Sequence, residues 1–372
     1  MKNQRFFYFM CLLLFVSFMV SCTQDESVDT NPTLEASLQG KTLASKKGIV
    51  NVTVSEFATG IMYPRGLKFG PDGNLYVASA GIGGDTSTSC EQVIPPVGPY
   101  LGGNTSSILK ISPNGDVSTV VDELPSDINA LGFTMGAADV EFMGNQMYAL
   151  LNAGCSHGNP DYPASVIKVN EDGTWSVVAD ISDYLANNPV AAPEEDDFEQ
   201  DGSLYSLINV RGTLYAIEPN HGELIKITTD GSVSRVLDFS AYYGHNVPTA
   251  MAFHGNFYVG NLRTFPLEGG SSNIYKVTPD GTPMIWATGF TGVLGVAFDA
   301  QNRLYVLETS QGGGPIPMTG RVVRVNNDKS RDVVVDHLFF PTGMTFGPDG
   351  ALYISNTGFG PPNGQILKVE FN

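Results

Sequence analysis

One sequence motif recurs six times along this chain, and it constrains the fold more than any other feature. In each copy an apolar residue and a tyrosine open a short, strand-like apolar segment. The tyrosines at this position are Tyr76, Tyr148, Tyr215, Tyr258, Tyr305 and Tyr353. The later copies lie about 43 to 48 residues apart, close to the roughly 40–50 residues of one four-stranded propeller blade. The first two intervals are longer and therefore carry insertions.

A second pair of apolar segments follows the tyrosine strand in the first five copies, and tight turns join the two segments. Asn114-Gly115 and Asp230-Gly231 are two of these turns. Such dipeptides are typical of tight hairpins, because the turn requires a positive φ. Each repeat is therefore predicted to be a four-stranded antiparallel blade. We expect an all-β fold, a single six-bladed β-propeller that spans residues 49–372.

The sixth repeat is incomplete, since the chain ends soon after the segment 365–369 and has no room for a fourth strand. The missing strand is predicted at the other end of the propeller, in residues 50–58. Its sequence Phe57-Ala58-Thr59-Gly60 is similar to Trp286-Ala287-Thr288-Gly289, which lies in the fourth strand of an earlier repeat. Pairing this strand with the last blade closes the ring and removes exposed sheet edges.

The first residues predict export. Lys2 and Arg5 precede an apolar run of about fifteen residues that ends at Ser21-Cys22, the pattern of a secretory signal peptide over residues 1–21. The end of this signal resembles the lipobox of bacterial lipoproteins, which implies lipidation of Cys22. A plain secreted protein is the alternative. Residues 22–48 are polar and are expected to form a flexible tether. The predicted location is the cell envelope, lipid-anchored at the outer membrane, in the periplasm or at the surface.

Charge restricts the partners. The chain carries 38 acidic and 20 basic residues, a net charge of −18. This excess argues against nucleic acid and anionic lipid surfaces, which repel an acidic protein. We expect membrane contact only through the lipid anchor, and a monomer. The acidic run at residues 194–197, with Glu199 and Asp201 just after it, is interpreted as a solvated loop or as a lip that attracts cations.

Two cysteines remain after removal of the signal peptide and lipidation of Cys22, namely Cys90 and Cys155. Both fall in loops between the second and third predicted strands of neighbouring blades. Exported proteins reach an oxidising compartment, which favours disulfide formation. We therefore predict a Cys90–Cys155 disulfide, with two unrelated buried thiols as the alternative.

Blade-forming motifs also show a family resemblance. The sequence from Gly70 to Ala78, Gly-Pro-Asp-Gly-Asn-Leu-Tyr-Val-Ala, and its counterpart at 347–355 are similar to NHL and gluconolactonase-like propellers. With Tyr63-Pro64-Arg65-Gly66-Leu67, the pattern resembles the ScyD/ScyE propeller family. Named members of that family belong to the gene cluster for scytonemin, an indolic-phenolic pigment. The resemblance implies a propeller fold throughout and, more weakly, a small exported substrate or ligand.

Long loops are expected on only one face of the propeller, where the links between blades and the loops between second and third strands lie. Residues that bind ligands usually lie on loops held by a rigid scaffold. The long segments are 80–106, 154–164, 180–203, 239–248, 262–272, 310–319 and 357–364. The ligand-binding candidates on this face are Arg65, Asn152, His157, Asn220, His221 and Arg263.

Polar residues also end the tyrosine strands, and four of them are candidates for a divalent cation such as calcium or magnesium. They are Glu218, Glu308, Asn261 and Asn356. Carboxylate and amide oxygens are the ligands that calcium prefers, and gluconolactonase-like enzymes use a site of this kind. This chain departs from them, because Pro64-Arg65-Gly66 stands where those enzymes have Glu-Gly-Pro. Polar strand ends that only face solvent are the alternative.

No motif for a serine nucleophile, a zinc site or a nucleotide-binding loop occurs in the sequence. The leading hypothesis is a lipid-anchored propeller that binds a small molecule or a protein partner on its loop-rich face. The alternative is a metal-dependent hydrolase or lyase of the gluconolactonase or NHL type that acts at the channel mouth. The sequence leaves open whether the protein is an enzyme.

Overall fold

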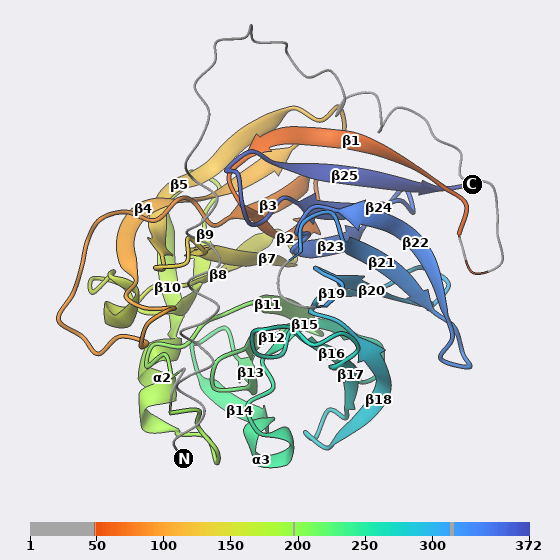
Figure 1. Ribbon diagram of the computed structural model, residues 1–372. Coiled ribbons are helices and arrows are strands. Elements are labelled where there is room, and N and C mark those ends of the chain that lie inside the picture. Colours follow the sequence, from red (N-terminus) through yellow and green to blue (C-terminus); the bar gives the residue numbers. More distant parts are fainter. Residues whose placement is uncertain (1–47, 49, 196–197, 313–315) are drawn as a thin grey trace, which may run out of the picture. The chain divides into compact units, whose positions relative to one another are not determined.

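The computed structural model describes residue 48 and residues 50–195, 198–312 and 316–372, and it is built almost entirely of antiparallel strands (Figure 1). The strands form six sheets arranged as a six-bladed β-propeller, as predicted from the repeat. The signal peptide at 1–21, the lipidation site Cys22 and the tether up to residue 47 lie outside the described residues. Among the residues described, no helix is both long enough and apolar enough to span a bilayer.

The first three blades follow one another in chain order. Blade 1 contains β2 (Pro64–Phe69), β3 (Leu75–Ser79), β4 (Leu101–Ile111), β5 (Val117–Ile128) and the short β6 (Thr134–Met135). Blade 2 contains β7 (Ala137–Met143), β8 (Gln146–Leu151), β9 (Ser165–Val169) and β10 (Trp175–Asp180). Blade 3 contains β11 (Ser206–Val210), β12 (Thr213–Glu218), β13 (Glu223–Ile227) and β14 (Val233–Asp238).

The other three blades complete the ring. Blade 4 contains β15 (Pro248–Phe253), β16 (Phe257–Asn261), β17 (Ser272–Val277) and β18 (Pro283–Phe290). Blade 5 contains β19 (Val293–Phe298), β20 (Leu304–Glu308), β21 (Gly320–Val325) and β22 (Arg331–Leu338). Blade 6 contains β23 (Gly343–Phe346), β24 (Leu352–Asn356), β25 (Gly364–Phe371) and β1 (Val52–Ile61).

The N-terminal strand closes the ring. β1 pairs antiparallel with β25, with Val54 opposite Val369, and so supplies the fourth strand of the last blade (Figure 1). The predicted closure is confirmed, although the strand starts and ends a few residues later than the predicted 50–58. The two ends of the propeller are therefore held in one sheet, and the backbone groups of β25 have a partner on both sides.

The recurrent tyrosine packs between blades. In four positions its ring contacts, edge to face, the phenylalanine near the end of the first strand of the next blade. These pairs are Tyr76–Phe142, Tyr258–Phe298, Tyr305–Phe346 and Tyr353–Phe69, with ring centres 5.0–5.1 Å apart. Aromatic pairs in this geometry contribute beyond the area they bury. The sequence repeat thus reflects contacts that join neighbouring blades.

The aspartate of the Gly-Pro-Asp-Gly turns holds the same tyrosine. The hydroxyl of Tyr76 donates to Asp72 at 2.9 Å, and that of Tyr353 donates to Asp349 at 3.0 Å. Lys110 pairs with Asp72 at 2.7 Å from the adjacent strand. The Gly-Pro-Asp-Gly turn and the tyrosine that follows it therefore form one structural unit, which links the turn, the second strand and the third strand of a blade.

The two faces of the propeller differ as the sequence predicts. One face has only tight turns, whereas the other carries the long β3–β4 loop, the 3-10 helix η3 (Cys155–His157) and the helices α2 (Ile181–Asn187) and α3 (Ser240–Tyr243). Most large hydrophobic side chains that remain exposed lie in loops or links of this second face: Met62, Ile82, Ile94, Leu131, Tyr162, Phe198, Tyr242, Phe265, Ile316 and Met318. The exposed apolar side chains thus lie mainly on the loop-rich face.

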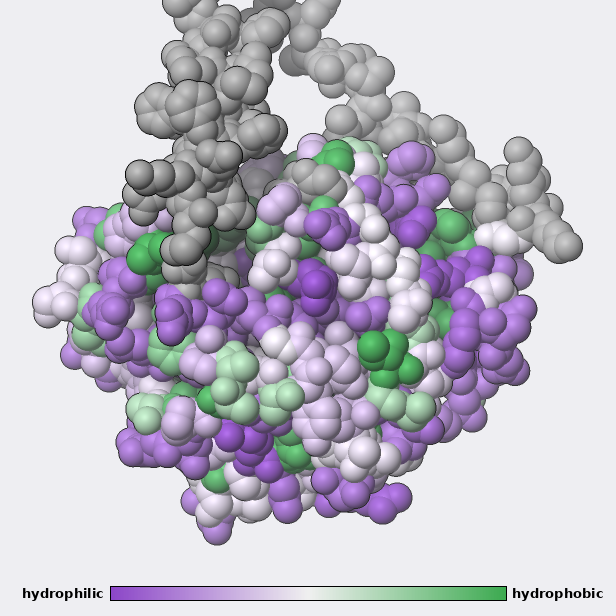
Figure 2. Space-filling model, turned by 60° about the horizontal axis from the view of Figure 1, so that its bottom comes forward, coloured by the Kyte–Doolittle hydropathy of each residue, from purple (hydrophilic) through white to green (hydrophobic). Residues whose placement is uncertain are grey.

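The view in Figure 2 is dominated by hydrophilic side chains, with hydrophobic ones in separate patches. This agrees with the excess of acidic residues in the sequence.

Candidate functional site

A cavity of about 250 Å³ lies on the loop-rich face, where loops of all six blades and the first strands of blades 1, 2, 4 and 5 converge. Its walls are largely apolar, and four phenylalanines from separate loops stand out among them: Phe133, Phe265, Phe340 and Phe359. The rings of Phe133 and Phe359 meet edge to face at 5.2 Å, and Phe265 stacks on Phe133 at 6.3 Å. We call this cavity the aromatic pocket.

Arg65, which is one of the predicted ligand-binding residues, forms part of the wall of this pocket. It is only 7% exposed, since it lies on the first strand of blade 1 close to the centre of the ring. Its Nη2 donates to the carbonyl of Thr134 at 2.5 Å, and its guanidinium carbon lies 4.6 Å from the centre of the Phe359 ring. Burial lowers the pKa of this arginine, because the charged form loses hydration.

His157 is fully buried beside the pocket and forms the centre of a charged cluster. Its Nδ1 lies 2.9 Å from Asp127 and its Nε2 lies 2.9 Å from the carbonyl of Gly202. Burial lowers the pKa of this histidine, but attraction to Asp127 and hydrogen bonding outweigh it and raise the pKa to about 9. His157 is therefore cationic at neutral pH and donates from both nitrogens. It does not line the pocket, so its place is structural.

Glu199 and Tyr100 connect this cluster to the pocket wall. The Tyr100 hydroxyl donates to Glu199 at 2.6 Å, and the other carboxylate oxygen of Glu199 lies 4.0 Å from Nε2 of His157. Both residues line the aromatic pocket. Burial and the neighbouring carboxylates hold the pKa of Tyr100 well above its usual value, so its hydroxyl stays protonated. Glu199 belongs to the acidic segment that was interpreted as a solvated loop or a lip that attracts cations, whereas Tyr100 was not predicted as a site residue.

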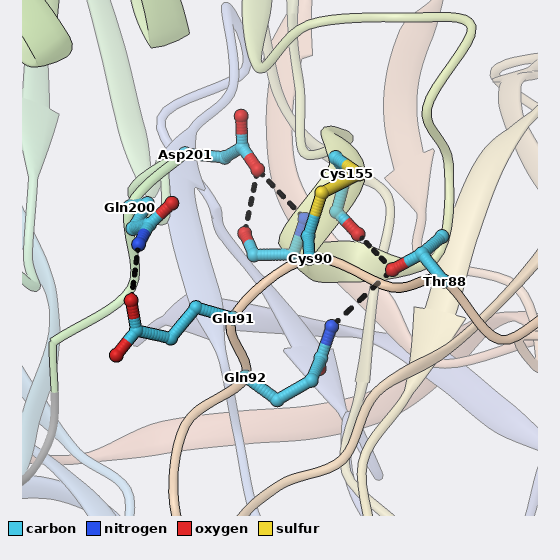
Figure 3. Close-up of a disulfide and its surroundings, with 8 residues drawn as sticks. Thr88, Cys90, Glu91, Gln92, Cys155, Gln200 and Asp201 are labelled. Atoms are coloured by element: carbon cyan, nitrogen blue, oxygen red, sulfur yellow. Dashed lines mark hydrogen bonds between the residues drawn. A yellow bond between two sulfur atoms is a disulfide. The ribbon is translucent and has the colours of Figure 1, made fainter.

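A disulfide between Cys90 and Cys155, with Cα atoms 5.8 Å apart, pins the long β3–β4 loop to η3 (Figure 3). Asp201 accepts from the backbone N–H and the hydroxyl of Ser156 at 2.8 and 2.6 Å. Gln200 donates to Glu91 at 3.0 Å. These contacts tie together three segments: the β3–β4 loop, η3 and the link from blade 2 to blade 3. The wall of the pocket on this side is thereby fixed.

Two predicted site residues at strand ends hold backbone in place. Asn152, which lines the pocket, exchanges hydrogen bonds with the backbone of Leu204 at 2.6 and 3.1 Å. Glu218 is fully buried and accepts N–H groups of Ser203, Asn220 and His221 at 2.7–3.0 Å. Buried polar groups require such partners.

The remaining predicted cation ligands have the same role. Glu308 accepts from the N–H of Thr291 at 2.8 Å and pairs with Arg321 at 2.6 Å. The amide oxygen of Asn261 accepts a backbone N–H at 2.7 Å, and that of Asn356 accepts one at 2.9 Å.

Glu218, Glu308, Asn261 and Asn356 therefore do not fit a shared cation site. They lie on four different blades, and each already accepts backbone N–H groups. Among the described residues, no cluster of three or more His, Cys, Asp or Glu could hold a metal ion. The binding of calcium or magnesium by this protein stays a prediction.

Three further ligand-binding candidates lie away from the pocket wall. Nδ1 of His221 lies 3.2 Å from Glu218, and attraction to this carboxylate outweighs the effect of burial and raises the histidine pKa. Asn220 accepts the N–H of Glu199 at 2.9 Å. Arg263 is half-buried in the β16–β17 loop, outside the residues that line the pocket.

Of the six predicted ligand-binding residues, the structure thus brings Arg65 and Asn152 to the pocket. The phenylalanines were missed, although their signal was present, since large apolar residues are unexpected in long surface loops.

A second cavity of about 260 Å³ lies inside the ring, lined by the first strands of the blades. The half-buried Asp139 lies in it, and burial raises the pKa of this carboxyl to about 7 although two backbone N–H groups donate to it. Next to it, Glu141 pairs with Lys68 at 2.8 Å. Gly66 faces Asp139 so closely that a Cβ there would lie 2.0 Å from its carboxylate oxygen.

Comparisons with known proteins define the fold further. No protein-family model matches the sequence, and no curated protein matches it. Among solved structures, a putative gluconolactonase is similar with a TM-score of 0.54 and 12% identity, over 88% of this chain and 95% of its own. A gluconolactonase from Xanthomonas campestris gives 0.52 and 12%, over 92% and 94%. The chain has the fold of the gluconolactonase-like six-bladed β-propellers.

A protein of unknown function from Bacteroides thetaiotaomicron is similar as well, with a TM-score of 0.54 and 11% identity, over 85% of this chain and 76% of its own. At such identities the likeness concerns the fold alone. Membership of the ScyD/ScyE family stays a prediction from the sequence.

Proposed function

We propose that this protein is an exported, lipid-anchored binding propeller that takes up a small aromatic molecule in the aromatic pocket. The observation that carries the proposal is the apolar cavity on the loop-rich face, to which all six blades contribute. Its volume of about 250 Å³ is just below the roughly 300–1,000 Å³ of ordinary ligand sites, which fits a small ligand. A pocket lined by phenylalanines with a few polar groups favours a flat, apolar ligand.

The polar groups beside the pocket support binding over catalysis. His157 is hydrogen bonded to Asp127 and to a carbonyl, and Glu199 accepts the Tyr100 hydroxyl. A general base must be able to reach the proton that it removes. These groups already serve one another, so their role is to fix the loops that frame the pocket.

Location and partners belong to the same proposal. The lipobox-like end of the signal and the polar residues after it support anchoring at the cell envelope, in the outer membrane, with the propeller in the periplasm or at the surface. The resemblance to the ScyD/ScyE family supports an exported aromatic ligand. The protein acts as a monomer in this proposal.

The binding of 2-naphthol, measured by calorimetry and by the shift in melting temperature, tests the proposal. Phe265 is 53% exposed at the pocket rim, so Phe265→Ala removes a stacking surface with little effect on the core. We expect about 3- to 10-fold weaker binding from the loss of one aromatic contact. Tyr242→Ala, at a residue 62% exposed on α3 and outside the pocket, is the matched control. Absence of binding to the wild type, or equal losses in both variants, would contradict the proposal.

A hydrolase or lyase is the second candidate function, and the raised pKa of Asp139 in the inner cavity is the observation that favours it. A channel carboxyl with a pKa near 7 is suited to proton transfer at neutral pH. The similar structures include gluconolactonases.

Hydrolysis of an aldonolactone, with and without a chelator, tests this candidate. The wild type should turn over the lactone and Asp139→Asn should not, whereas Asp336→Asn, at a half-exposed carboxylate of β22, should keep wild-type activity. Absence of turnover by the wild type rejects the hydrolase.

A further inference from the structure

We infer that the ligand of the aromatic pocket carries a carboxylate that the guanidinium of Arg65 binds, while the phenylalanine rings cover its apolar body. The inference rests on the proposed function and adds the chemical class of the ligand. It starts from Arg65, a buried arginine of which only 7% is exposed. Arginine is almost never buried without a paired charge.

Arg65 makes few contacts for a buried guanidinium. An arginine has five N–H groups to donate. Within the part of the chain that the structure describes, a single hydrogen bond is formed, to the carbonyl of Thr134, and no carboxylate lies within ion-pair distance. The small exposed part of the side chain belongs to the pocket wall. A ligand in the pocket is therefore the partner to which the remaining N–H groups can donate.

The acidic groups nearby have other partners. Asp127 exerts an electrostatic attraction on Arg65, but its carboxylate lies 2.9 Å from the cationic His157. Glu199 lines the pocket and would repel an anion, yet it accepts the Tyr100 hydroxyl and lies 4.0 Å from Nε2 of the same histidine. Two carboxylates thus share the charge of His157, and Arg65 is left as the cation that faces the cavity.

The geometry of Arg65 suits a planar anion. Phe359 lies 4.6 Å from the guanidinium carbon, which places the cation against an aromatic face. Arginine binds carboxylates through two parallel N–H···O bonds, and these are stronger than bonds between neutral groups. An aromatic acid satisfies both parts of the pocket, because its ring contacts the phenylalanines and its carboxylate reaches the guanidinium.

Paired probes test the inference. We would titrate 2-naphthoate and 2-naphthylmethanol, which share the ring system and differ in the charged group, by calorimetry into the full exported chain. Wild-type protein should bind the acid about 10- to 100-fold more tightly than the alcohol. Arg65→Gln should weaken the acid by a similar factor and leave the alcohol nearly unchanged. Arg211→Gln, at an exposed arginine in the β11–β12 turn, is the matched control and should bind both as the wild type does.

The outcomes separate this inference from the proposed function. If both probes bind the wild type with equal affinity, the carboxylate is not recognised and the inference is overturned, while the aromatic pocket keeps its role. If neither probe binds, the proposed function fails as well. Circular dichroism and a melting curve show whether Arg65→Gln folds. If Arg65→Gln does not fold, the comparison of the two probes on the wild type and on Arg65→Lys tests the inference. Lysine keeps the positive charge, so Arg65→Lys should still bind the acid more tightly than the alcohol, as the control Arg211→Gln should.

Discussion

Replacing His157 by glutamine removes the cation from a fully buried ion pair. In the wild type its Nδ1 lies 2.9 Å from Asp127, whose second oxygen has no hydrogen-bond partner among the described residues. The pair joins η3 to β5, and the Nε2–Gly202 bond extends the connection to the link that precedes blade 3. Glutamine keeps a hydrogen-bonding amide at this position but carries no charge.

The pH dependence of stability follows from the pKa of His157. The pKa is about 9 in the folded protein and 6.5 in the unfolded chain. A histidine whose pKa is raised by folding stabilises the protein fully below its unfolded pKa, and this contribution is lost as the pH rises through the folded pKa. Each pKa unit corresponds to about 1.4 kcal/mol, so the wild type should lose about 3 kcal/mol of unfolding free energy between pH 6.5 and 9 from this group.

Urea unfolding at several pH values between 6 and 9.5 measures this contribution, with the disulfide kept oxidised. The difference in unfolding free energy between the wild type and His157→Gln should be largest at pH 6 and should shrink by about 3 kcal/mol toward pH 9.5. Titrating groups that do not interact with His157 are common to both proteins and cancel in the difference. A difference that stays constant over this range would refute the assignment of a cationic His157.

Three further predictions follow from the covalent and steric features of the fold. Replacing Cys90 and Cys155 by serine should lower the unfolding free energy by about 4 kcal/mol, because the bond closes a loop with a sequence separation of 65, and urea melts in oxidising and reducing buffer check this. Gly66→Ala should destabilise by roughly 1–3 kcal/mol, since its Cβ would lie 2.0 Å from a carboxylate oxygen of the next blade, whereas Gly269→Ala, with its nearest contact at 4.0 Å, should change the melting temperature little. Deleting residues 48–61 should leave β25 without its outer partner, so limited proteolysis should cut the last blade far faster than in the whole propeller.

Much of the fold was predictable because its determinants are local. The tyrosine phrase and the Asp-Gly turns depend on neighbours within a few residues, as the Asp72–Tyr76 bond shows. Ring closure was also predictable, since β1 resembles the fourth strands of other blades and the last blade lacks one. Cys90 and Cys155 lie in equivalent loops of adjacent blades, and this placement correctly predicted the disulfide between them.

The candidate site was predicted less well. Strand-end polarity suggested oxygen ligands for a cation, but Glu218 and Glu308 accept backbone N–H groups of loops that no sequence pattern identifies as their partners. His157 was expected at a ligand and instead pairs with Asp127, which is 30 residues away in sequence. The phenylalanines of the pocket come from loops whose conformations depend on contacts with other loops.

The sequence by itself determined the blades, their number and the face on which long loops gather, because strand periodicity, turn residues and the repeat are encoded within short segments. Tertiary structure alone decided which polar residues bind the backbone and which face the aromatic pocket. At the centre of the ring, six blades bring together side chains from distant parts of the chain, and a buried charge is paired with whichever group that packing places beside it. Asp127 is thus held by His157, whereas Arg65 faces the cavity.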